Sequence, residues 1–211
     1  MPKPPSAPEV TMKFVIEQSE ETEAKKGFSN KLEQFTFTTH VATHYDAPSH
    51  FTVKGRNIDE YPMEYFYMVP TLVLDIPKDI YGEISVEDIR KAERECGNIH
   101  SGDLVLINTG SYKRYYDAAY NKSPYLTEEA ACYLASKGIK MLGIDSFTVD
   151  DPRKPEKPAH VVLLKDNGIL IIECVTNLNR IPEHRFNSIG LPINIKDGSG
   201  AFVRLVGVFS D

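Results

Sequence analysis

Four side chains of the kind that bind metal ions lie close together near residue 45. Three of the six histidines and one aspartate fall within eleven residues, at positions His40, His44, Asp46 and His50. All intervals between them are even, so on an extended chain these side chains would share one face. Imidazole and carboxylate ligands suit Zn²⁺ or Mn²⁺, and the absence of Cys from the cluster argues against a structural zinc site. The segment therefore predicts a catalytic metal site.

Regular secondary structure cannot bring all four side chains to one ion. Residues four apart on a strand are separated by ~13 Å. A helix would align His40 with His44 but turn Asp46 away, at ~100° per residue. Pro48 favours a turn at this point. We therefore expect a strand that ends in a loop curling around the ion.

A metal held in this way indicates hydrolytic chemistry. A bound divalent ion lowers the pKa of its water toward ~7, which makes hydroxide available as a nucleophile at neutral pH. His50 is the candidate general acid/base, or else a further imidazole ligand. A non-haem Fe(II) oxygenase would need only His44, Asp46 and one distant His, and such enzymes usually have all-β folds. A metal-containing binding protein without turnover is a third alternative.

The pattern of apolar residues in the rest of the chain predicts alternating strands and helices. Strand patterns occupy residues 10–16, 32–39, 71–76, 103–108, 140–145, 169–175 and 202–209. Ser85 can cap a helix over 86–95 that ends at Gly97, and Thr127 can cap a second helix that ends near Gly138. The charged stretch 19–26 is a solvated loop or helix. This order predicts an α/β domain with a mixed sheet.

Length and composition set the remaining expectations. The chain has 211 residues, 41% of them hydrophobic, which suits one domain over 10–211 after a flexible, Pro-rich segment 1–9. The net charge of -6 and the lack of a basic run argue against a nucleic-acid partner. No apolar run approaches the ~18 residues of a membrane span. Three cysteines without a CxxC pair are expected to be buried thiols in a cytoplasmic protein.

The metal-type segment resembles a known family. Residues 40–50, HVATHYDAPSH, resemble the HxGTHxDxPxH signature of the cyclase family of metal-dependent hydrolases, which includes kynurenine formamidase and isatin hydrolase. Residues 102–110 and 143–150 resemble the family's central strand and its G-x-D-x-x-S-x-D segment, with Thr148 in place of Ser. Residues 160–178 resemble its distal metal-binding stretch, and the likeness covers roughly 32–208.

The resemblance implies a function and a fuller site. His40, His44 and Asp46 would hold one metal, and Asp46 would bridge to a second one held with His160 and Glu173. The ion would be Zn²⁺, with Mn²⁺ as the alternative, and His50 would move the proton. The fold would be swivelling β/β/α-like, with a partly closed sheet flanked by helices, in a homodimer or homotetramer. The substrate would be a small amide or cyclic amide, as in kynurenine formamidase, or a lactam or lactone, as in isatin hydrolase.

The chain departs from the family pattern at two points. Ala42 stands where the family usually has Gly, which predicts a strained loop if the position needs a positive φ. The chain also contains no Trp, whereas kynurenine formamidases carry one near the N-terminus that packs on the substrate. Phe28, Phe35 and Tyr45 are the candidates for an aromatic wall in its place.

Overall fold

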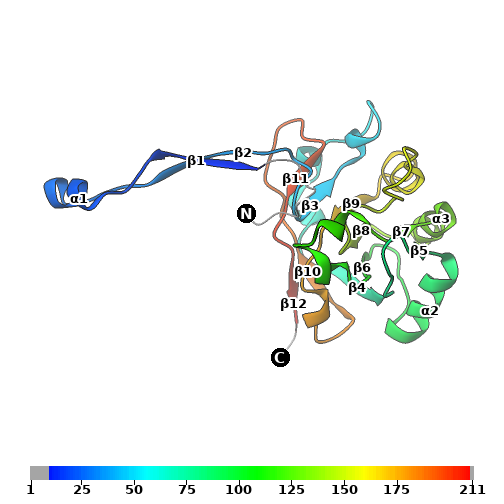
Figure 1. Cartoon of the computed structure of the whole chain (residues 1–211). Coiled ribbons are helices and arrows are strands. Elements are labelled where there is room, and N and C mark those ends of the chain that lie inside the picture. Colours follow the sequence, from blue (N-terminus) through cyan, green and yellow to red (C-terminus); the bar gives the residue numbers. More distant parts are fainter. Residues whose placement is uncertain (1–9, 210–211) are drawn as a thin grey trace.

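An eight-stranded mixed sheet forms the centre of the protein (Figure 1). The computed structural model describes residues 10–209, so the expected flexible segment 1–9 lies outside the described residues. In sheet order the strands are β11 (Gly200–Phe202), β3 (His44–Asp46), β9 (Leu170–Glu173), β8 (Met141–Ile144), β6 (Leu104–Asn108), β4 (Val69–Asp75), β10 (Arg185–Ile189) and β12 (Val206–Val208). The four strands β4, β6, β8 and β9 pair in parallel, and the outer ones pair antiparallel. The expected α/β fold with a mixed, curled sheet is confirmed.

Both faces of the central sheet are buried. Along β6, Val105 and Ile107 point into a core that includes helices α2 (Val86–Cys96) and α3 (Glu128–Ser136), while Leu104 and Leu106 point into a second core on the opposite face. This alternation follows from the two-residue period of a strand. Burial on both faces explains why the central strands are continuous apolar runs in the sequence.

The two expected helices are confirmed at their caps. The Ser85 hydroxyl accepts a hydrogen bond from the Asp88 N–H at the start of α2, and Thr127 accepts one from the Ala130 N–H at the start of α3. Gly97 and Gly138 follow the helix ends with φ of 121° and 70°. Such positive φ values favour glycine because it has no Cβ.

The expected strand 202–209 is wrong as a single element. The chain forms β11 at one edge of the sheet, pairs β11 with β3, then crosses to the other edge and forms β12 beside β10. A strand pattern shows that a segment is extended but not which edge it joins. Strands β3 and β10 were not predicted from the sequence. β3 is only three residues long, and β10 carries the polar Asn187 and Ser188.

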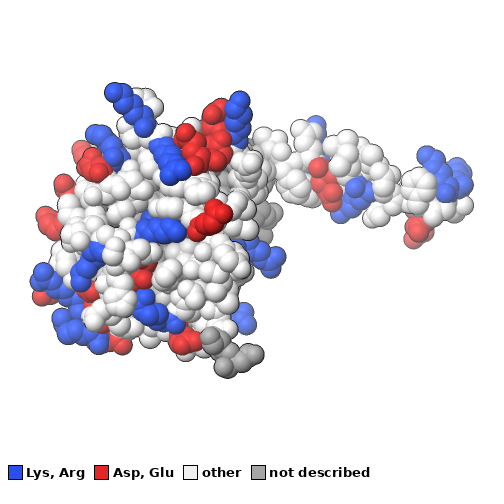
Figure 2. All heavy atoms as spheres, turned by 180° about the vertical axis from the view of Figure 1, so that it is seen from behind, with Lys and Arg blue, Asp and Glu red and all other residues white. Residues whose placement is uncertain are grey.

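A hairpin arm projects from the body of the protein (Figure 1). Strands β1 (Thr11–Ile16) and β2 (Leu32–Thr36) pair antiparallel, and helix α1 (Glu20–Lys26) connects them at the tip. Every residue of β1 is exposed, and the view from behind shows that much of the surface near the base of the arm is neither acidic nor basic (Figure 2). The two strands were expected, but they lie outside the central sheet.

Shorter elements complete the chain. A parallel pair joins β5 (Glu83–Ile84) to β7 (Tyr125–Leu126), and helix α4 (Pro158–His160) continues into the π-helical turn η6 (Val161–Asp166). The 3-10 turns are η1 (Pro48–His50), η2 (Ile58–Glu60), η3 (Met63–Tyr65), η4 (Ser111–Arg114), η5 (Ala118–Asn121) and η7 (Leu178–Arg180). Among residues 10–209, no helix has the length and apolar character needed to cross a membrane.

Candidate metal centre

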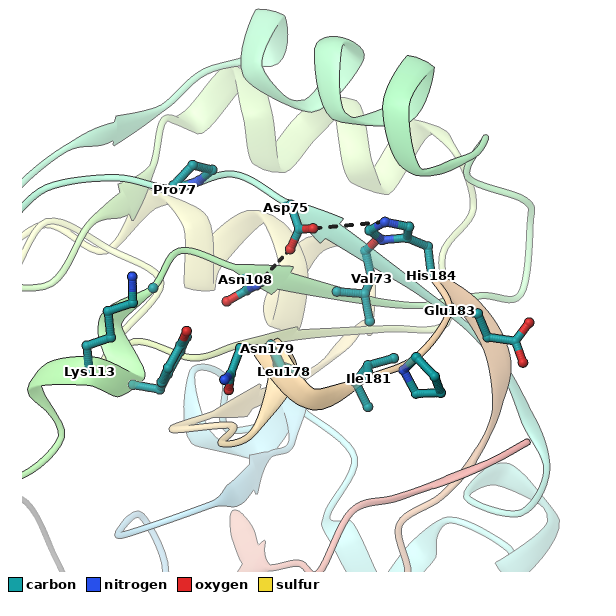
Figure 3. A pocket seen from close by; sticks show the side chains of 13 residues that line it. Val73, Asp75, Pro77, Asn108, Lys113, Leu178, Asn179, Ile181, Glu183 and His184 are labelled. Carbon is teal, nitrogen blue, oxygen red and sulfur yellow. Dashed lines mark hydrogen bonds and ion pairs between the residues drawn. The ribbon is translucent and has the colours of Figure 1, made fainter. Parts of the chain in front are cut away.

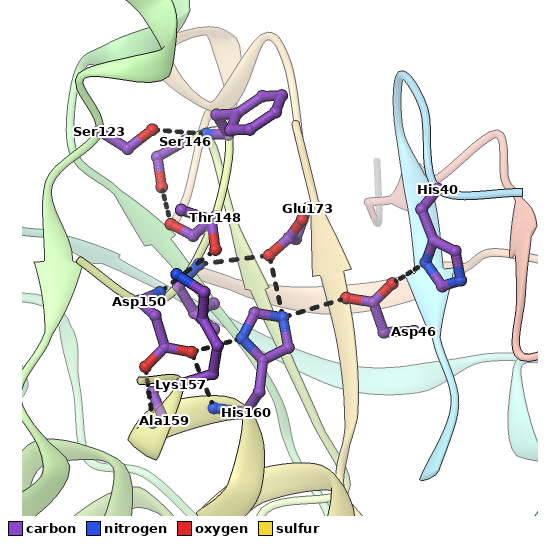
Figure 4. A network of polar contacts seen from close by, with 12 residues as sticks. His40, Asp46, Ser123, Ser146, Thr148, Asp150, Lys157, Ala159, His160 and Glu173 are labelled. Atoms are coloured by element: carbon purple, nitrogen blue, oxygen red, sulfur yellow. Dashed lines mark hydrogen bonds and ion pairs between the residues drawn. The ribbon is translucent and has the colours of Figure 1, made fainter. Parts of the chain in front are cut away.

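The side chains singled out in the sequence converge on one cavity of about 250 Å³. Six of the residues that line it are His40, His44, Asp46, His50, His160 and Glu173. They come from three separate parts of the chain, and Figure 4 shows four of them facing one another. The structure therefore brings together every residue that was expected to bind a metal or move a proton.

Strand pairing places three of these side chains, His44, Asp46 and Glu173. In the antiparallel pairing of β3 with β9, His44 lies directly opposite Glu173. Asp46 is two residues along β3 and so points to the same side as His44. The His44 Nε2 atom lies 3.2 Å from Asp46 Oδ1 and 3.8 Å from Glu173 Oε2. All three side chains are buried.

His160 comes from a different element and lies beside the same two carboxylates, those of Asp46 and Glu173. It ends α4 and precedes η6, and single π-helical turns of this kind are frequent at functional sites. Its Nε2 atom lies 3.5 Å from Asp46 Oδ2 and 3.4 Å from Glu173 Oε1. The His40 Nδ1 atom lies 2.6 Å from Asp46 Oδ1. The two carboxylate oxygens of Asp46 thus face different imidazoles, an arrangement suited to bridging two ions.

Hydrogen bonds behind the centre orient its two buried histidines. The His160 Nδ1 atom lies 2.5 Å from the buried carboxylate of Asp150, which also accepts the backbone N–H groups of Ala159 and His160. The His44 Nδ1 atom lies 2.8 Å from the carbonyl oxygen of Ala42. With Nδ1 donating in both rings, each Nε2 faces the carboxylates and becomes a ligand once an ion displaces its proton, as in metal-ligating histidines.

The loop before β3 is strained, as the sequence predicted. Ala42 has a φ of 57°, in the left-handed region that favours glycine. This conformation aims its carbonyl oxygen at His44. A left-handed conformation costs a residue with a Cβ about 1–2 kcal/mol. Backbone strain is therefore located beside a candidate ligand, a common feature of functional sites.

His40 and His50 line the mouth of the cavity. Their rings stack with centroids 3.9 Å apart, and His50 is exposed at its outer edge. His40 also contacts the Ser199 hydroxyl through Nε2, at 3.0 Å. Partial burial of the His50 ring and the neighbouring histidines lower the pKa of His50 to about 4. His50 is therefore neutral at neutral pH and can accept a proton.

The centre is electrostatically prepared for a cation. Burial by itself would lower the pKa of His44, but the carboxylates of Asp46 and Glu173 outweigh this effect and raise the pKa to about 9. Burial would raise the pKa of Asp46, yet the charge of His44 and hydrogen bonds from the histidines hold it well below the usual range. The Asp46 carboxylate thus retains its negative charge and attracts positive charge.

The donor set fits a divalent metal ion. His44, Asp46 and Glu173 each place one ligand atom within 4.8 Å of the other two, and so do His40, Asp46 and His50. No Lys or Arg forms an ion pair with Asp46 or Glu173 among the residues that the structure describes; their charged partners are histidines. Imidazole nitrogens with two carboxylates suit zinc or a similar ion.

The expected loop is present but interrupted by a strand, and the expected aromatic wall is wrong. The bends at 39–43 follow β2, residues 44–46 form β3 because β11 and β9 pair with them, and the 3-10 turn η1 comes next. Tyr45 is not an aromatic wall: it is buried in the core, and its hydroxyl donates to the Gly190 carbonyl. Phe28 and Phe35 lie on the arm and do not line the cavity.

Several contributors to the site were not assigned a role from the sequence. Phe51 stacks on the His160 ring with centroids 4.6 Å apart, and Phe51 and Phe147 supply the aromatic lining of the cavity. Lys157 also lines the cavity. Asp150 lies in a segment that the family resemblance covered, so that segment was the available signal for its importance.

Comparison with known proteins agrees with this geometry. The kynurenine formamidase of Bacillus cereus is 30% identical over 173 residues, which are 82% of this chain and 78% of that protein. Isatin hydrolase A from Labrenzia aggregata, solved with benzyl benzoate, is 27% identical with a TM-score of 0.83, covering 98% of this chain and 87% of that one. An isatin hydrolase bound to the product analogue thioisatinate is 26% identical with a TM-score of 0.80, over 96% and 83% of the two chains.

The fold and the cluster of imidazoles and carboxylates define this chain as a metal-binding α/β protein. A family model described as putative cyclase matches residues 5–151, more than half of the chain. The protein belongs to this family.

The strain at Ala42 generates a first prediction. Replacing Ala42 with Gly relieves about 1–2 kcal/mol of left-handed strain and costs about 0.5–1 kcal/mol of unfolded-state entropy, so stability should rise by about 0.5–1 kcal/mol. Chemical denaturation measures the change. The control Ala47→Gly, at a position with φ of -99°, should be destabilising. A less stable Ala42→Gly variant would contradict the left-handed conformation.

The raised pKa of His44 generates a second prediction. Below about pH 9 this imidazole carries a proton that an ion must displace, so Zn²⁺ binding should release protons. The affinity should therefore rise with pH, by about tenfold per unit for each proton released. Calorimetric titrations in two buffers of different ionisation enthalpy count the protons. A pH-independent affinity would refute the coupling.

Proposed function

We propose that the protein is a metal-dependent hydrolase of a small amide or cyclic amide. The observation that carries this proposal is the convergence of buried imidazoles and carboxylates on one cavity, with Asp150 and the Ala42 carbonyl orienting the two buried histidines. Family membership and the likeness to kynurenine formamidases and isatin hydrolases support the reaction class. These relatives act on carbon–nitrogen bonds other than peptide bonds.

Five side chains would hold the metal. His40, His44 and Asp46 would bind one ion, and Asp46 would be shared with a second ion held by His160 and Glu173. We propose Zn²⁺, with Mn²⁺ as the alternative, because both accept nitrogen and oxygen ligands. The bound ion supplies Lewis acidity toward the substrate carbonyl and a lowered pKa for its water.

His50 would move the proton. Its lowered pKa keeps the imidazole neutral at neutral pH, so it can take a proton from the attacking water and deliver it to the departing nitrogen. Its position at the mouth of the cavity, stacked on His40, places it beside the candidate ligands without burying it among them.

The cavity lining suits a flat apolar substrate. Val41, Phe51 and Phe147 give it apolar walls, and aromatic rings of this kind pack on planar molecules. Phe147 and Phe51 would therefore take the place of the Trp that the chain lacks. This lining fits both an aromatic formamide and a fused-ring lactam such as isatin.

Removal of His50 tests the assignment. His50→Ala should retain the metal but lose about 10²–10⁴ of the turnover, the usual contribution of a general acid/base. Asp46→Asn should lose metal and turnover together, whereas His100→Ala, at an exposed position, should lose neither. The measurements are metal content by plasma emission and assays with N-formylkynurenine and isatin.

Each outcome has a distinct meaning. Near wild-type turnover in His50→Ala would remove His50 from its role. Full metal content without turnover of any amide or lactone would favour a metal-containing binding protein. A folded chain that takes up no Zn²⁺ or Mn²⁺ would refute the metal centre.

We also propose that the protein is a homodimer or homotetramer, with the arm as its contact. A two-stranded hairpin is only marginally stable in water by itself. This arm exposes large apolar side chains, among them Phe14, Val15 and Leu32, and contiguous exposed apolar surface marks an interaction site. Exchange of an arm between two copies would bury this surface symmetrically.

Charge placed on the arm tests the oligomer. The double substitution Phe14→Asp and Phe35→Asp should shift the protein to monomers in light scattering coupled to size-exclusion chromatography. The control Tyr116→Asp changes a 72% exposed side chain on the body and should leave the mass unchanged. A wild-type chain that is already monomeric would refute the proposal.

The cellular location is proposed from the cysteines. Cys96, Cys132 and Cys174 are free thiols, which suits a reducing cytoplasm. The expectation that all three are buried is wrong, because only Cys174 is buried, while Cys132 is exposed and Cys96 is partly exposed.

A further inference from the structure

A second group of metal-type donors lies outside the centre described above. Asp75, Cys96 and His184 each place one ligand atom within 4.8 Å of the other two. Asp75 ends strand β4, Cys96 ends helix α2, and His184 directly precedes strand β10. Three regular elements thus bring a carboxylate, a thiol and an imidazole to one place.

The imidazole and the carboxylate are held in orientations that suit ligation. The His184 Nδ1 atom lies 3.1 Å from the Val73 carbonyl oxygen, and the Val73 N–H donates to the His184 carbonyl oxygen at 2.8 Å. Nδ1 therefore donates, and Nε2 faces Asp75 Oδ2 at 3.9 Å. The Asn108 amide donates to the other Asp75 oxygen at 2.7 Å (Figure 3). Such outer hydrogen bonds fix a histidine tautomer and leave one carboxylate oxygen for an ion.

The site is open to an incoming ion. Asp75 and His184 are exposed, and both line a cavity of about 390 Å³ at the carboxyl ends of the parallel strands β4 and β6 (Figure 3). Cys96 is partly exposed. A thiolate and a carboxylate together neutralise the charge of a divalent cation. Three protein ligands leave at least one coordination position for water or a small ligand from the cavity.

We propose that Asp75, Cys96 and His184 bind one Zn²⁺ ion, separate from the centre proposed for hydrolysis. A mixed thiolate, imidazole and carboxylate set is typical of zinc and ill suited to Mg²⁺ or Ca²⁺, which prefer oxygen alone. The ion would link the end of α2 to the end of β4 and to the residue that precedes β10. This assignment does not depend on the hydrolase activity.

Cobalt substitution tests the site, because Co²⁺ bound to a thiolate absorbs strongly in the near ultraviolet. The full chain, stripped of metal and titrated with Co²⁺, should develop this absorption with the intensity of one thiolate-bound ion per chain. Cys96→Ser should abolish the absorption and lower the zinc content by one equivalent per chain. His184→Ala should weaken cobalt binding by at least tenfold. The matched control Cys132→Ser, at an exposed thiol on α3, should behave as the wild type.

Two results would overturn the proposal. One is a chain that binds Co²⁺ without thiolate absorption. The other is absorption that persists in Cys96→Ser, since the thiolate would then come from another residue, such as Cys174 in the hydrolytic cavity. Circular dichroism is the check that Cys96→Ser folds, and wild-type zinc content in a folded variant would also refute the site.

The two metal sites can be separated experimentally. Glu173→Gln disrupts the proposed hydrolytic centre but leaves Asp75, Cys96 and His184 intact, so the thiolate absorption should remain. Conversely, Cys96→Ser should retain amide hydrolysis. Failure of the hydrolase assignment would therefore leave this test valid.

Discussion

The pairing of β3 with β9 is the constraint on which the candidate centre depends. It places His44 opposite Glu173 and leaves Asp46 on the same side, with all three side chains buried. Burying two carboxylates carries a large desolvation penalty unless they are paired or bind a metal. Without an ion, the histidines pair with the carboxylates and offset this penalty. The raised pKa of His44 is a consequence of this pairing. A divalent ion would supply it more completely, because it brings two positive charges to the same point.

The surrounding structure supports this short pairing from both sides. β11 pairs with the other edge of β3, and Gly200 there lies opposite Asp46, where a Cβ would come within 2.6 Å of the His40 ring. The parallel strands β8 and β9 anchor Glu173 in the core, and Asp150 holds His160 against the same carboxylates. The candidate ligands therefore lie on or beside rigid elements. The packing around Ala42 stabilises its strained backbone conformation.

Much of the fold follows from patterns that act locally. The caps at Ser85 and Thr127, the apolar runs of β4, β6, β8 and β9, and the mixed sheet implied by alternating strands and helices are all predicted by the sequence. Local patterns do not report pairing partners. For this reason the segment 202–209 was expected to form one strand, although its two halves lie at opposite edges of the sheet. The arm could not be predicted for the same reason. The sequences of β1 and β2 have strand patterns, but they do not show that these strands pair only with each other.

The sequence by itself determined the chemistry of the centre: four metal-type residues within eleven, a proline that bends the chain, and an alanine where strain was expected. Spacing alone could not link these residues to His160 and Glu173, more than a hundred positions away; only the family resemblance suggested that link. Tertiary structure decided it, because the sheet register and the π-helical turn set which distant side chains meet. It also decided the ring orientations of His44 and His160, the exposure of His50 and the meeting of Asp75, Cys96 and His184. Those properties depend on contacts between elements that are distant in the sequence. Such contacts exist only in the folded chain, so the residue types alone do not reveal them.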